Sequence, residues 1–596
     1  MRTIAKFLIG SLASLGFFVL TLIGIFIYFL SNMDGLPNQA AKVPDNIVLS
    51  LNLDAGFSEG QGGTDFSALG VSTKRTTLQD AVIALRRAGN DGRVKAVVAN
   101  ISGQSLGLAQ VQEIRDAVAK FRTSGKPTLL YTDTLGELGN ATTAYYLATA
   151  FEKIWLQPSG SIGLTGLAIE QPYLRGFLDK LGVRANVLQR YEYKSAAENL
   201  TNTEMSEPNK EALDALFGSI FNQIVEGIAH SRDISQDNVK ALMANGPLLA
   251  KEAMHGGLVD RLAYRDEFNQ SLDDMIEGGK RVSVRRYLGF GLPEETPEAK
   301  RSIAIINAVG AIARGTSDGS PFSRQSGIGA DTLAKAVRDA AEDKGVDAIL
   351  LRVDSPGGSY VASDTIWREI IRAKEAGKPF IVSMGNTAAS GGYFIAMNAD
   401  TIFAQPGTIT GSIGVIVNKL VFEDALDKLG INWSTLKYGE NGDIFTPSRD
   451  FNAAELDRMN RTLDAIYDDF TTKAAEGRDM PIEEMRGLAK GRVWSGADAK
   501  RIGLVDKLGG LSDAIDHTKV AIGLAPDDLV KLVSYPKQKD PFQSVLDALE
   551  DGSFPFGIES AIESLVAITQ SINTWITPYA RGPEAGVLYA PTLIIR

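Results

Sequence analysis

Two stretches of the sequence place a side chain that could do chemistry among small neighbours. Ser390 lies in TAASGGYF (387–394), and Lys194 lies in YKSA (193–196). A serine on a turn from a strand into a helix is accessible to substrate and lies near the positive end of the helix dipole. Its hydroxyl needs a base, and a desolvated lysine whose pKa is lowered toward neutrality can take the proton. The pattern therefore favours a Ser–Lys dyad.

Histidine and cysteine chemistry is almost absent from the chain. The 596 residues contain no Cys and only three His, namely His230, His255 and His517, which are far apart and form no metal-binding pattern. A disulfide framework, a thiolate nucleophile and a Cys-based zinc or iron–sulfur site are therefore excluded. Unless the fold recruits one of the histidines, acid–base chemistry is left to Lys, Asp, Glu or Tyr. We expect neither a cofactor nor a metal.

Each candidate residue also has a simpler interpretation. Ser390 could be a small residue in tight helix–strand packing, and Lys194 could be a solvated surface lysine, because lysine is rarely buried. The run GTITGSIGV (407–415) resembles a phosphate loop only weakly, and we interpret it as structural. Its Ser412 is a candidate partner of the lysine.

The chain contains the same domain twice. Gln-Pro at 157–158 recurs at 405–406, and Lys-Leu-Gly at 180–182 recurs at 428–430. The match extends in both directions from these segments, and such self-similarity identifies a duplicated domain.

Both copies alternate helical patterns with short apolar runs rich in β-branched residues, such as VKAVVANI (94–101) and VDAILLRV (346–353). This alternation predicts an α/β fold in which βαβ units surround a parallel sheet buried on both faces. Long helices are expected near 208–231 and 453–475, the first opened by Ser206. The predicted parts are a cytoplasmic N-terminus with an anchor, a membrane-proximal segment, the first copy, a linker, the second copy and a tail: 1–31, 32–75, 76–276, 277–300, 301–519 and 520–596.

The two copies differ at the positions that could do chemistry. After its strand the second copy has a glycine pair at 357–358, which either forms a simple turn or exposes an N–H group to a carbonyl oxygen, and the first copy has no such pair. Ser390 falls opposite Thr142, and Lys194 has no lysine counterpart in the second copy. One dyad per chain is therefore expected, with the lysine from the first copy and the serine from the second.

A membrane segment is predicted at the N-terminus. Residues 7–30 form 24 consecutive residues without a charge. As a helix they would be about 36 Å long, enough to span a hydrocarbon core of about 30 Å. Arg2 and Lys6 precede this segment, so the N-terminus is expected in the cytoplasm and the rest of the chain on the periplasmic side of a bacterial inner membrane.

The charge balance bears on the partners. The chain has 61 Lys and Arg against 72 Asp and Glu, and no long basic run. Phosphate binding needs clustered basic residues, so nucleic acid is not expected as a partner.

In combination, four motifs resemble the signal peptide peptidase A (protease IV) family in its long, tandem-repeat, membrane-anchored form. They are DSPGGS (354–359), TAASGGYF (387–394), GTITGSIGV (407–415) and YKSA (193–196). The resemblance covers nearly the whole chain. It implies two tandem domains similar in fold to Clp proteases and crotonase-type enzymes.

The resemblance also implies roles for individual residues. Ser390 would be the nucleophile, Lys194 the general base and Ser412 the residue that orients the lysine, and the backbone N–H groups of Gly358 and Gly391 would form the oxyanion hole. The substrates would be apolar signal-peptide fragments near the bilayer, and a homotetramer is expected. Whether the lysine reaches the serine of its own chain or of a neighbour is open at this stage.

Two other functions compete with a protease. One is a crotonase-like acyl-CoA enzyme, which also holds an oxyanion with backbone N–H groups. The other is a non-catalytic, membrane-tethered scaffold in which the repeat builds an oligomer.

Overall fold

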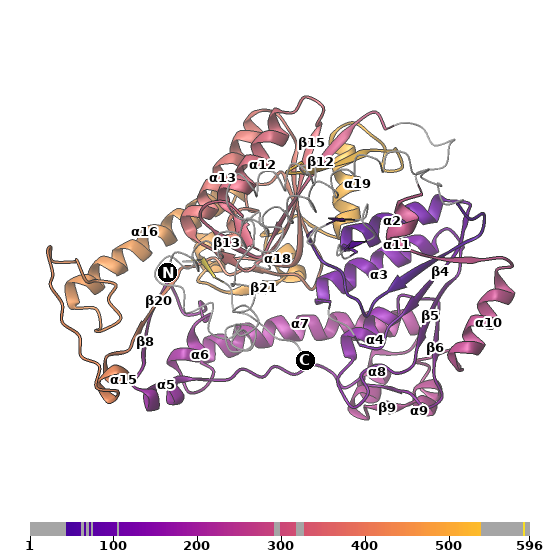
Figure 1. The fold of residues 1–596 in the computed structure, drawn as a ribbon, viewed down its shortest axis with the longest axis horizontal. Helices are drawn as coiled ribbons and strands as arrows, with labels where there is room; N and C mark the ends of the chain where they lie inside the picture. The colour runs from indigo at the N-terminus through magenta and orange to yellow at the C-terminus, as the bar shows by residue number, and fades with distance from the viewer. Residues whose placement is uncertain are drawn as a thin grey trace, which may run out of the picture. The chain divides into compact units, whose positions relative to one another are not determined.

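A computed structural model describes residues 43–60, 65–66, 71–72, 76–103, 106–290, 299–317, 327–537 and 588–589. The chain divides into two compact units, Met1–Asp45 and Asn46–Arg596. The predicted membrane anchor at 7–30 lies outside the described residues. Within the described ranges, no helix combines the length and the apolar character needed to cross a bilayer. All helices and strands given below belong to the second unit (Figure 1).

The first copy is built on a six-stranded sheet in which all the described strand pairs are parallel. Its strands are β10 (Arg261–Leu262), β6 (Lys153–Leu156), β5 (Thr128–Thr132), β4 (Val94–Asn100), β1 (Ile47–Asn52) and β11 (Lys280–Ser283), in sheet order. One face packs against α10 (Arg265–Met275), where Trp155, Phe268 and Leu272 share a core. The other helices of this copy include α2 (Leu78–Asn90), α3 (Leu108–Arg122), α4 (Thr142–Ala148) and α11 (Val284–Leu288).

The second copy repeats this plan with a larger sheet. Its main path is β21 (Val493–Ser495), β19 (Ile409–Gly411), β17 (Phe380–Ala389), β15 (Ala348–Ser355), β12 (Ser302–Val309) and β23 (Lys531–Tyr535), with β18 (Thr401–Ala404) and β22 (Lys507–Leu508) attached beside β17. In the second sheet only the β19–β21 pair is antiparallel among the strand pairs described. The helices that contribute core residues around the sheet include α12 (Ala330–Glu342), α13 (Tyr360–Glu375) and α19 (Leu511–Ala521). The structure thus confirms the predicted parallel-rich α/β architecture, while the likeness to Clp and crotonase enzymes stays a prediction.

The sheets reach beyond the ranges predicted for the copies. β1 lies in the predicted membrane-proximal segment, β11 in the predicted linker, and β23 in the predicted tail. β11 and β23 are equivalent edge strands, since each pairs with the first strand of its copy, and their sequences KRVS and KLVS match. Strands of four to six residues between polar loops carry little periodicity of their own, so the predicted boundaries fell inside the two sheets.

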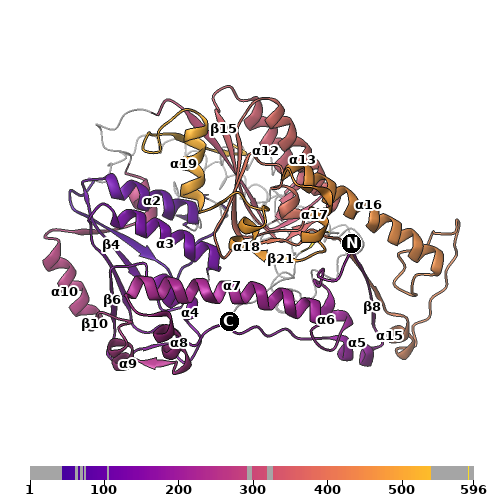
Figure 2. The ribbon, with the colours of Figure 1, turned by 180° about the vertical axis from the view of Figure 1, so that it is seen from behind.

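The two copies interlock through long-range contacts. α7 (Glu207–Arg232), the predicted long helix opened by Ser206, belongs to the first copy but packs on β21 of the second. Ser219 Oγ on α7 lies 3.0 Å from Ser495 Oγ. The second long helix is α16 (Ala453–Gly477), close to its predicted range. Figures 1 and 2 show α7 running along both copies, between α4 of the first and the β21 region of the second.

A second link between the copies is a two-stranded antiparallel ribbon. β8 (Arg184–Gln189) of the first copy pairs along its whole length with β20 (Ile416–Val421) of the second. Each strand is accompanied by a short helix, α5 (Arg175–Leu181) and α15 (Glu423–Lys428). Because β8 leads directly toward Lys194, this ribbon carries the first copy's lysine into the second copy.

Short elements complete the unit. A small sheet has the order β14 (Gly327–Gly329), β13 (Ala311–Ala313), β16 (Gly357–Gly358) and β24 (Leu588–Tyr589). The remaining elements are β2 (Asp65–Phe66), β3 (Val71–Ser72), β7 (Ser161–Ile162), α6 (Glu198–Thr201), α8 (Gln236–Ala244), β9 (Leu248–Leu249), α9 (Ala250–His255), α14 (Gly391–Phe394), α17 (Ile482–Leu488) and α18 (Gly496–Arg501).

Candidate active site

The candidate residues come from four separate segments of the chain. Ser390 lies between β17 and α14, and Ser412 directly follows β19. Gly358 lies in β16, and Lys194 lies in the loop between β8 and α6 of the other copy. The fold brings all four segments to one place, where β17 and β19 end.

Lys194 and Ser390 are in direct contact. The Nζ atom of Lys194 lies 2.8 Å from Ser390 Oγ, 2.8 Å from the carbonyl oxygen of Ser412 and 2.9 Å from Ser412 Oγ. A neutral amine has two N–H groups and one lone pair. It can therefore donate to both oxygens of Ser412 and accept the proton of the Ser390 hydroxyl. The contact forms between the two copies of one chain.

The surroundings of Lys194 favour this neutral form. Its side chain is only 1% exposed, and burial lowers its pKa well below the usual value for lysine. The loop that carries it is packed closely on the loop after α17, since Tyr193 N donates to Lys490 O and a Cβ atom on Gly491 would lie 2.5 Å from Lys194 Cβ. Only glycine fits at that position, which also has a φ of +82°. Of the two interpretations of Lys194, the structure therefore contradicts the solvated surface residue.

Both serines occupy backbone conformations that favour glycine. Ser390 has φ 56° and ψ −116°, and Ser412 has φ 52°. Hydrogen bonds hold them there: Ser390 N donates to Gly411 O at 2.8 Å, and Ser412 N donates to Arg492 O at 2.7 Å. Such strain persists only where the surroundings impose it, and it is common at active sites. For Ser390 it is the kind of sharp strand-to-helix turn that aims a hydroxyl at a substrate.

The two glycines predicted for the oxyanion hole lie side by side. A Cβ atom on Gly391 would be 3.1 Å from the backbone N of Gly358. Gly358 itself is pressed against β13, where a Cβ atom would lie 2.0 Å from Ile312 O. The backbones of both glycines therefore meet next to Ser390, and neither position has room for a larger residue without movement.

A strand near the end of the chain lies beside the glycine pair 357–358. β24 pairs antiparallel with β16, with Leu588 opposite Gly358 and Tyr589 opposite Gly357. The backbone of the glycine pair is therefore able to hold an extended peptide segment next to Ser390.

Other features predicted or considered from the sequence lie outside this cluster. His517 contacts Thr401 and Lys507, and its pKa is lowered by burial and by the charge of Lys507. Over the described ranges, no group of three His, Asp or Glu is arranged to hold a metal ion.

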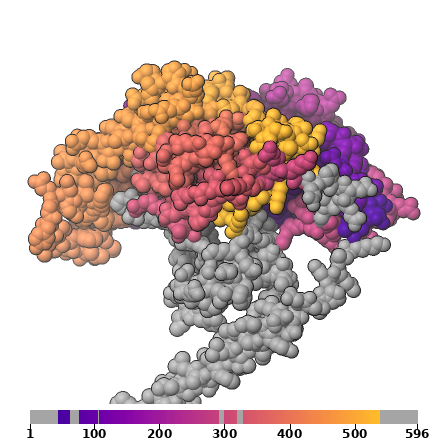
Figure 3. Space-filling view, turned by 90° about the horizontal axis from the view of Figure 1, so that it is seen from above, coloured from indigo at the N-terminus to yellow at the C-terminus, as the bar shows by residue number. Residues whose placement is uncertain are grey.

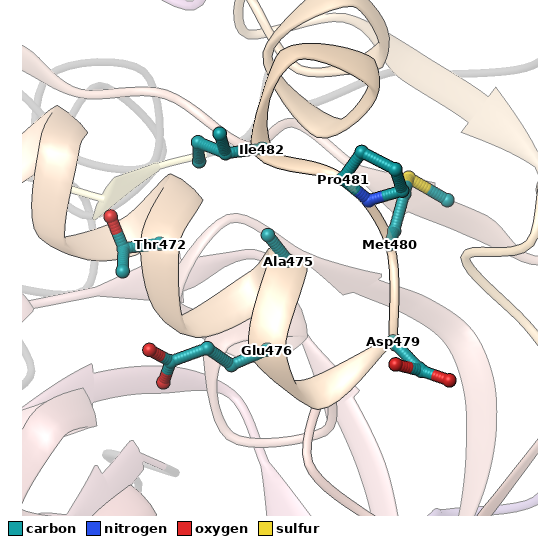
Figure 4. Close-up of a pocket in the computed structure, with 7 residues that line it drawn as sticks. All are labelled: Thr472, Ala475, Glu476, Asp479, Met480, Pro481 and Ile482. Carbon is teal, nitrogen blue, oxygen red and sulfur yellow. The ribbon is translucent and has the colours of Figure 1, made fainter.

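A separate open cavity of about 500 Å³ lies where α16 ends and α17 begins (Figure 4). It is lined by Thr472, Ala475, Glu476, Asp479, Met480, Pro481 and Ile482.

Sequence reasoning missed a buried ionic group next to the site. Arg352 on β15 forms salt bridges with Glu59 and Glu113 of the first copy, and all three side chains are buried. A charged residue inside the apolar run AILLRV was the available signal. The partners lie more than 200 residues away in the chain, so no local pattern identifies them.

Comparison with known proteins gives two kinds of match. The model of peptidase family S49 matches residues 120–277 and 372–525. The chain is 31% identical over 497 residues to the chloroplastic serine protease SPPA of Arabidopsis thaliana, covering 82% of this chain and 72% of that protein. It is 30% identical over 562 residues to Protease 4 of Haemophilus influenzae, covering 89% and 87%.

A shorter match is to a putative signal peptide peptidase SppA of Enterococcus faecium, with 36% identity over 231 residues that cover 38% of this chain and 67% of that one. The two family matches fall one in each copy of the repeat, as the duplication predicts.

Proposed function

The chain belongs to peptidase family S49, as the resemblance of its motifs indicated, and on this premise we propose that it is a serine endopeptidase with a Ser–Lys dyad that degrades released signal peptides. The observation that carries the proposal is the 2.8 Å contact between Lys194 Nζ and Ser390 Oγ in a buried setting that contains no histidine.

In the proposed reaction, neutral Lys194 takes the hydroxyl proton as Ser390 Oγ attacks the scissile carbonyl carbon. The tetrahedral oxyanion is held by the N–H groups of Gly358 and Gly391, which are fixed in place before the substrate binds. The lysinium then protonates the leaving amine, and water releases the acyl group by the reverse proton path. Ser412 supports this role of Lys194 because both of its oxygens lie within 2.9 Å of Nζ and fix the direction of the amine.

An extended peptide is the substrate form that the site favours. The edge of β16 that pairs with β24 offers backbone N–H and C=O groups to an antiparallel strand, and we infer that a substrate peptide takes the place of β24 there. The name of the Enterococcus faecium relative supports signal peptides as the substrate class. The predicted anchor at 7–30 would keep the site at the periplasmic face of the inner membrane, where such apolar peptides remain.

Exposed apolar side chains support the expected oligomer. They gather on the segment between α15 and α16, at the end of the molecule that is orange in Figure 3. Those on this segment are Leu429, Ile431, Trp433, Leu436, Tyr438 and Phe445. A monomeric protein rarely leaves such a patch open, so we propose that it packs on further copies in the homotetramer.

The function is tested with a synthetic apolar signal peptide incubated with the full chain in mild detergent between pH 6 and 9. We expect endoproteolytic fragments in mass spectrometry and a rate that rises with pH, because Lys194 must be neutral to act as a base. A flat profile would count against a lysine base. Retention on a coenzyme A resin without peptide cleavage would instead favour the crotonase-like enzyme.

Removing residues 588–596 is expected to lower KM for peptides by about fivefold, with kcat unchanged. The edge of β16 can pair with one strand at a time, and the loss of one competing backbone hydrogen bond corresponds to about that factor. Steady-state kinetics measure the effect, and a chain that lacks only residues 590–596 and keeps β24 is the control. Equal KM values for the two truncated chains would show that β24 does not compete with substrate.

A further inference from the structure

Strand β17 changes register just before the catalytic serine. Between the pairs Val353–Met384 and Ser355–Ala388, β15 advances by two residues and β17 by four. Residues 385–387 of β17 therefore bulge opposite the single residue Asp354. Such bulges re-aim the residues that follow them, and Ser390 comes three residues after this one.

The bulge is held at each of its three residues. The carbonyl of Gly385 accepts from Thr408 Oγ1 at 2.8 Å, and Asn386 Oδ1 accepts from Gln110 N at 3.2 Å. Thr387 N donates to Asp354 Oδ1 at 2.9 Å. Of these three contacts, only the one to Asp354 involves a group that titrates.

Asp354 also precedes the glycine pair 357–358, which supplies the Gly358 N–H group of the proposed oxyanion hole. Its carbonyl oxygen accepts from Gly310 N at 2.9 Å, and Gly357 and Gly358 follow three and four residues later. The single contact between Asp354 and Thr387 therefore ties together the strand that leads to the oxyanion donors and the strand that leads to the nucleophile.

Asp354 adjoins the buried ionic group that joins the two copies. Arg352 Nη2 donates to Glu59 Oε1 at 3.0 Å and to Glu113 Oε2 at 2.7 Å. A Cβ atom on Gly385 would lie 3.1 Å from Asp354 Cγ and 3.3 Å from Glu59 Oε1, so both carboxyl groups lie against Gly385. One guanidinium thus faces three carboxyl groups, and the cluster favours one bound proton.

Two of these carboxyl groups have a raised pKa, Glu113 and Asp354, and of the two it is Asp354 that accepts from Thr387 N in the bulge. Burial and the neighbouring charges of Glu59 and Glu113 raise its pKa to about 7, against the lowering effects of Thr387 N–H and Arg352.

We propose that Asp354 is a positioning residue whose carboxylate, once ionised, tightens the bulge of β17 and sets Ser390 against the N–H groups of Gly358 and Gly391. This inference rests on the proposed function. An ionised carboxylate accepts a backbone N–H bond more strongly than a neutral carboxyl does, so the geometry of the site depends on pH separately from the titration of Lys194.

The test compares Asp354→Asn with the wild-type chain between pH 5.5 and 8.5. Asparagine keeps an oxygen for Thr387 N–H but stays neutral, so it imitates the protonated aspartate at every pH. We expect the ratio of wild-type to variant kcat to rise from about 1 at low pH to about tenfold at high pH, with a midpoint near 7 and KM unchanged. Taking the ratio cancels the titration of Lys194, which both proteins share.

Asp116→Asn is the matched control. Asp116 is also an aspartate with a raised pKa at the contact between the copies, but it accepts from Gln405 and does not touch the bulge. We expect the ratio of wild-type kcat to Asp116→Asn kcat to be independent of pH. A merely structural role of Asp354 would likewise give a ratio that is flat with pH, and this result would overturn the proposal.

Two further measurements keep the proposal separate from the proposed function. The rate at which a small active ester acylates Ser390 is followed in parallel, because it does not require a peptide substrate and should show the same pH-dependent ratio. If Asp354→Asn fails to fold, Glu59→Gln replaces it, and loss of that negative charge should move the midpoint of the acylation profile below that of wild type. An unchanged midpoint would overturn the proposal, whereas absence of peptide cleavage with normal acylation would count only against the peptidase.

Discussion

Ser390→Ala is expected to lower kcat for peptide cleavage by about 10⁴- to 10⁶-fold and to abolish labelling by serine-directed acylating probes. The substitution removes one oxygen atom from a fully buried side chain and keeps Cβ, so the strained turn and the hydrogen bond from Ser390 N to Gly411 O remain. Lys194 keeps both contacts to Ser412, so the proposed base stays in place while the proposed nucleophile is lost.

Ser363→Ala is the matched control for this prediction. Ser363 is equally buried and lies beside Gly391, but its hydroxyl donates to Ser359 O and does not contact Lys194. Its activity and its labelling should remain within a few-fold of wild type. If Ser390→Ala were still labelled stoichiometrically, the nucleophile would be another residue.

Local sequence patterns were sufficient to predict much of the fold and the site. The parallel sheets follow from apolar runs such as that of β15, because a strand buried on both faces needs apolar residues at nearly every position. The glycine pair and Ser390 were recognisable because their chemistry depends on neighbours in the sequence. Small residues directly after a strand allow a substrate to approach the backbone at the end of that strand.

The contact between Lys194 and Ser390 could not be derived from local pattern. It needs the pairing of β8 with β20 and the close approach of Gly491 to Lys194, and these segments are more than 200 residues apart. Comparing the two copies showed that the first keeps the lysine and the second keeps the serine. This difference suggested that Lys194 and Ser390 act together, but it did not give the geometry of their contact. The ionic group around Arg352 was missed for the same reason.

The duplication explains why one copy could lose its own reactive residues. In the first copy Thr142 falls opposite Ser390 in the sequence, and its Oγ1 accepts from the backbone N of Gly166 at 2.9 Å. The Thr142 hydroxyl therefore holds the loop at Gly166 in place. The first copy contributes the buried Lys194 and the carboxylates of Glu59 and Glu113 to the second copy, so the proposed active site depends on the contact between the copies as much as on either sheet.

Lys194→Met is expected to lower kcat by about 10²- to 10⁴-fold, the usual contribution of a general base. Methionine has a similar length and no charge, and it can occupy the buried space without donating to Ser390 or Ser412. Lys490→Met is the control, since Lys490 lies in the loop that packs on Tyr193 but pairs with Glu192 at the surface. Steady-state kinetics at pH 8 measure both variants, and wild-type kcat in Lys194→Met would exclude the lysine as the base.

The same variant tests whether Lys194 is neutral in the folded protein. Burial lowers its folded-state pKa, whereas in the unfolded chain lysine has a pKa of about 10.4. Between these two values the unfolded state binds one more proton, so this group makes the free energy of unfolding rise with pH by up to about 1.4 kcal/mol per unit. Lys194→Met lacks this contribution, while Lys490→Met keeps it. Urea titrations between pH 7 and 9 should therefore give a stability difference between Lys194→Met and wild type that shifts in favour of wild type as pH rises. A difference independent of pH would mean that Lys194 keeps its proton on folding and cannot accept one from Ser390.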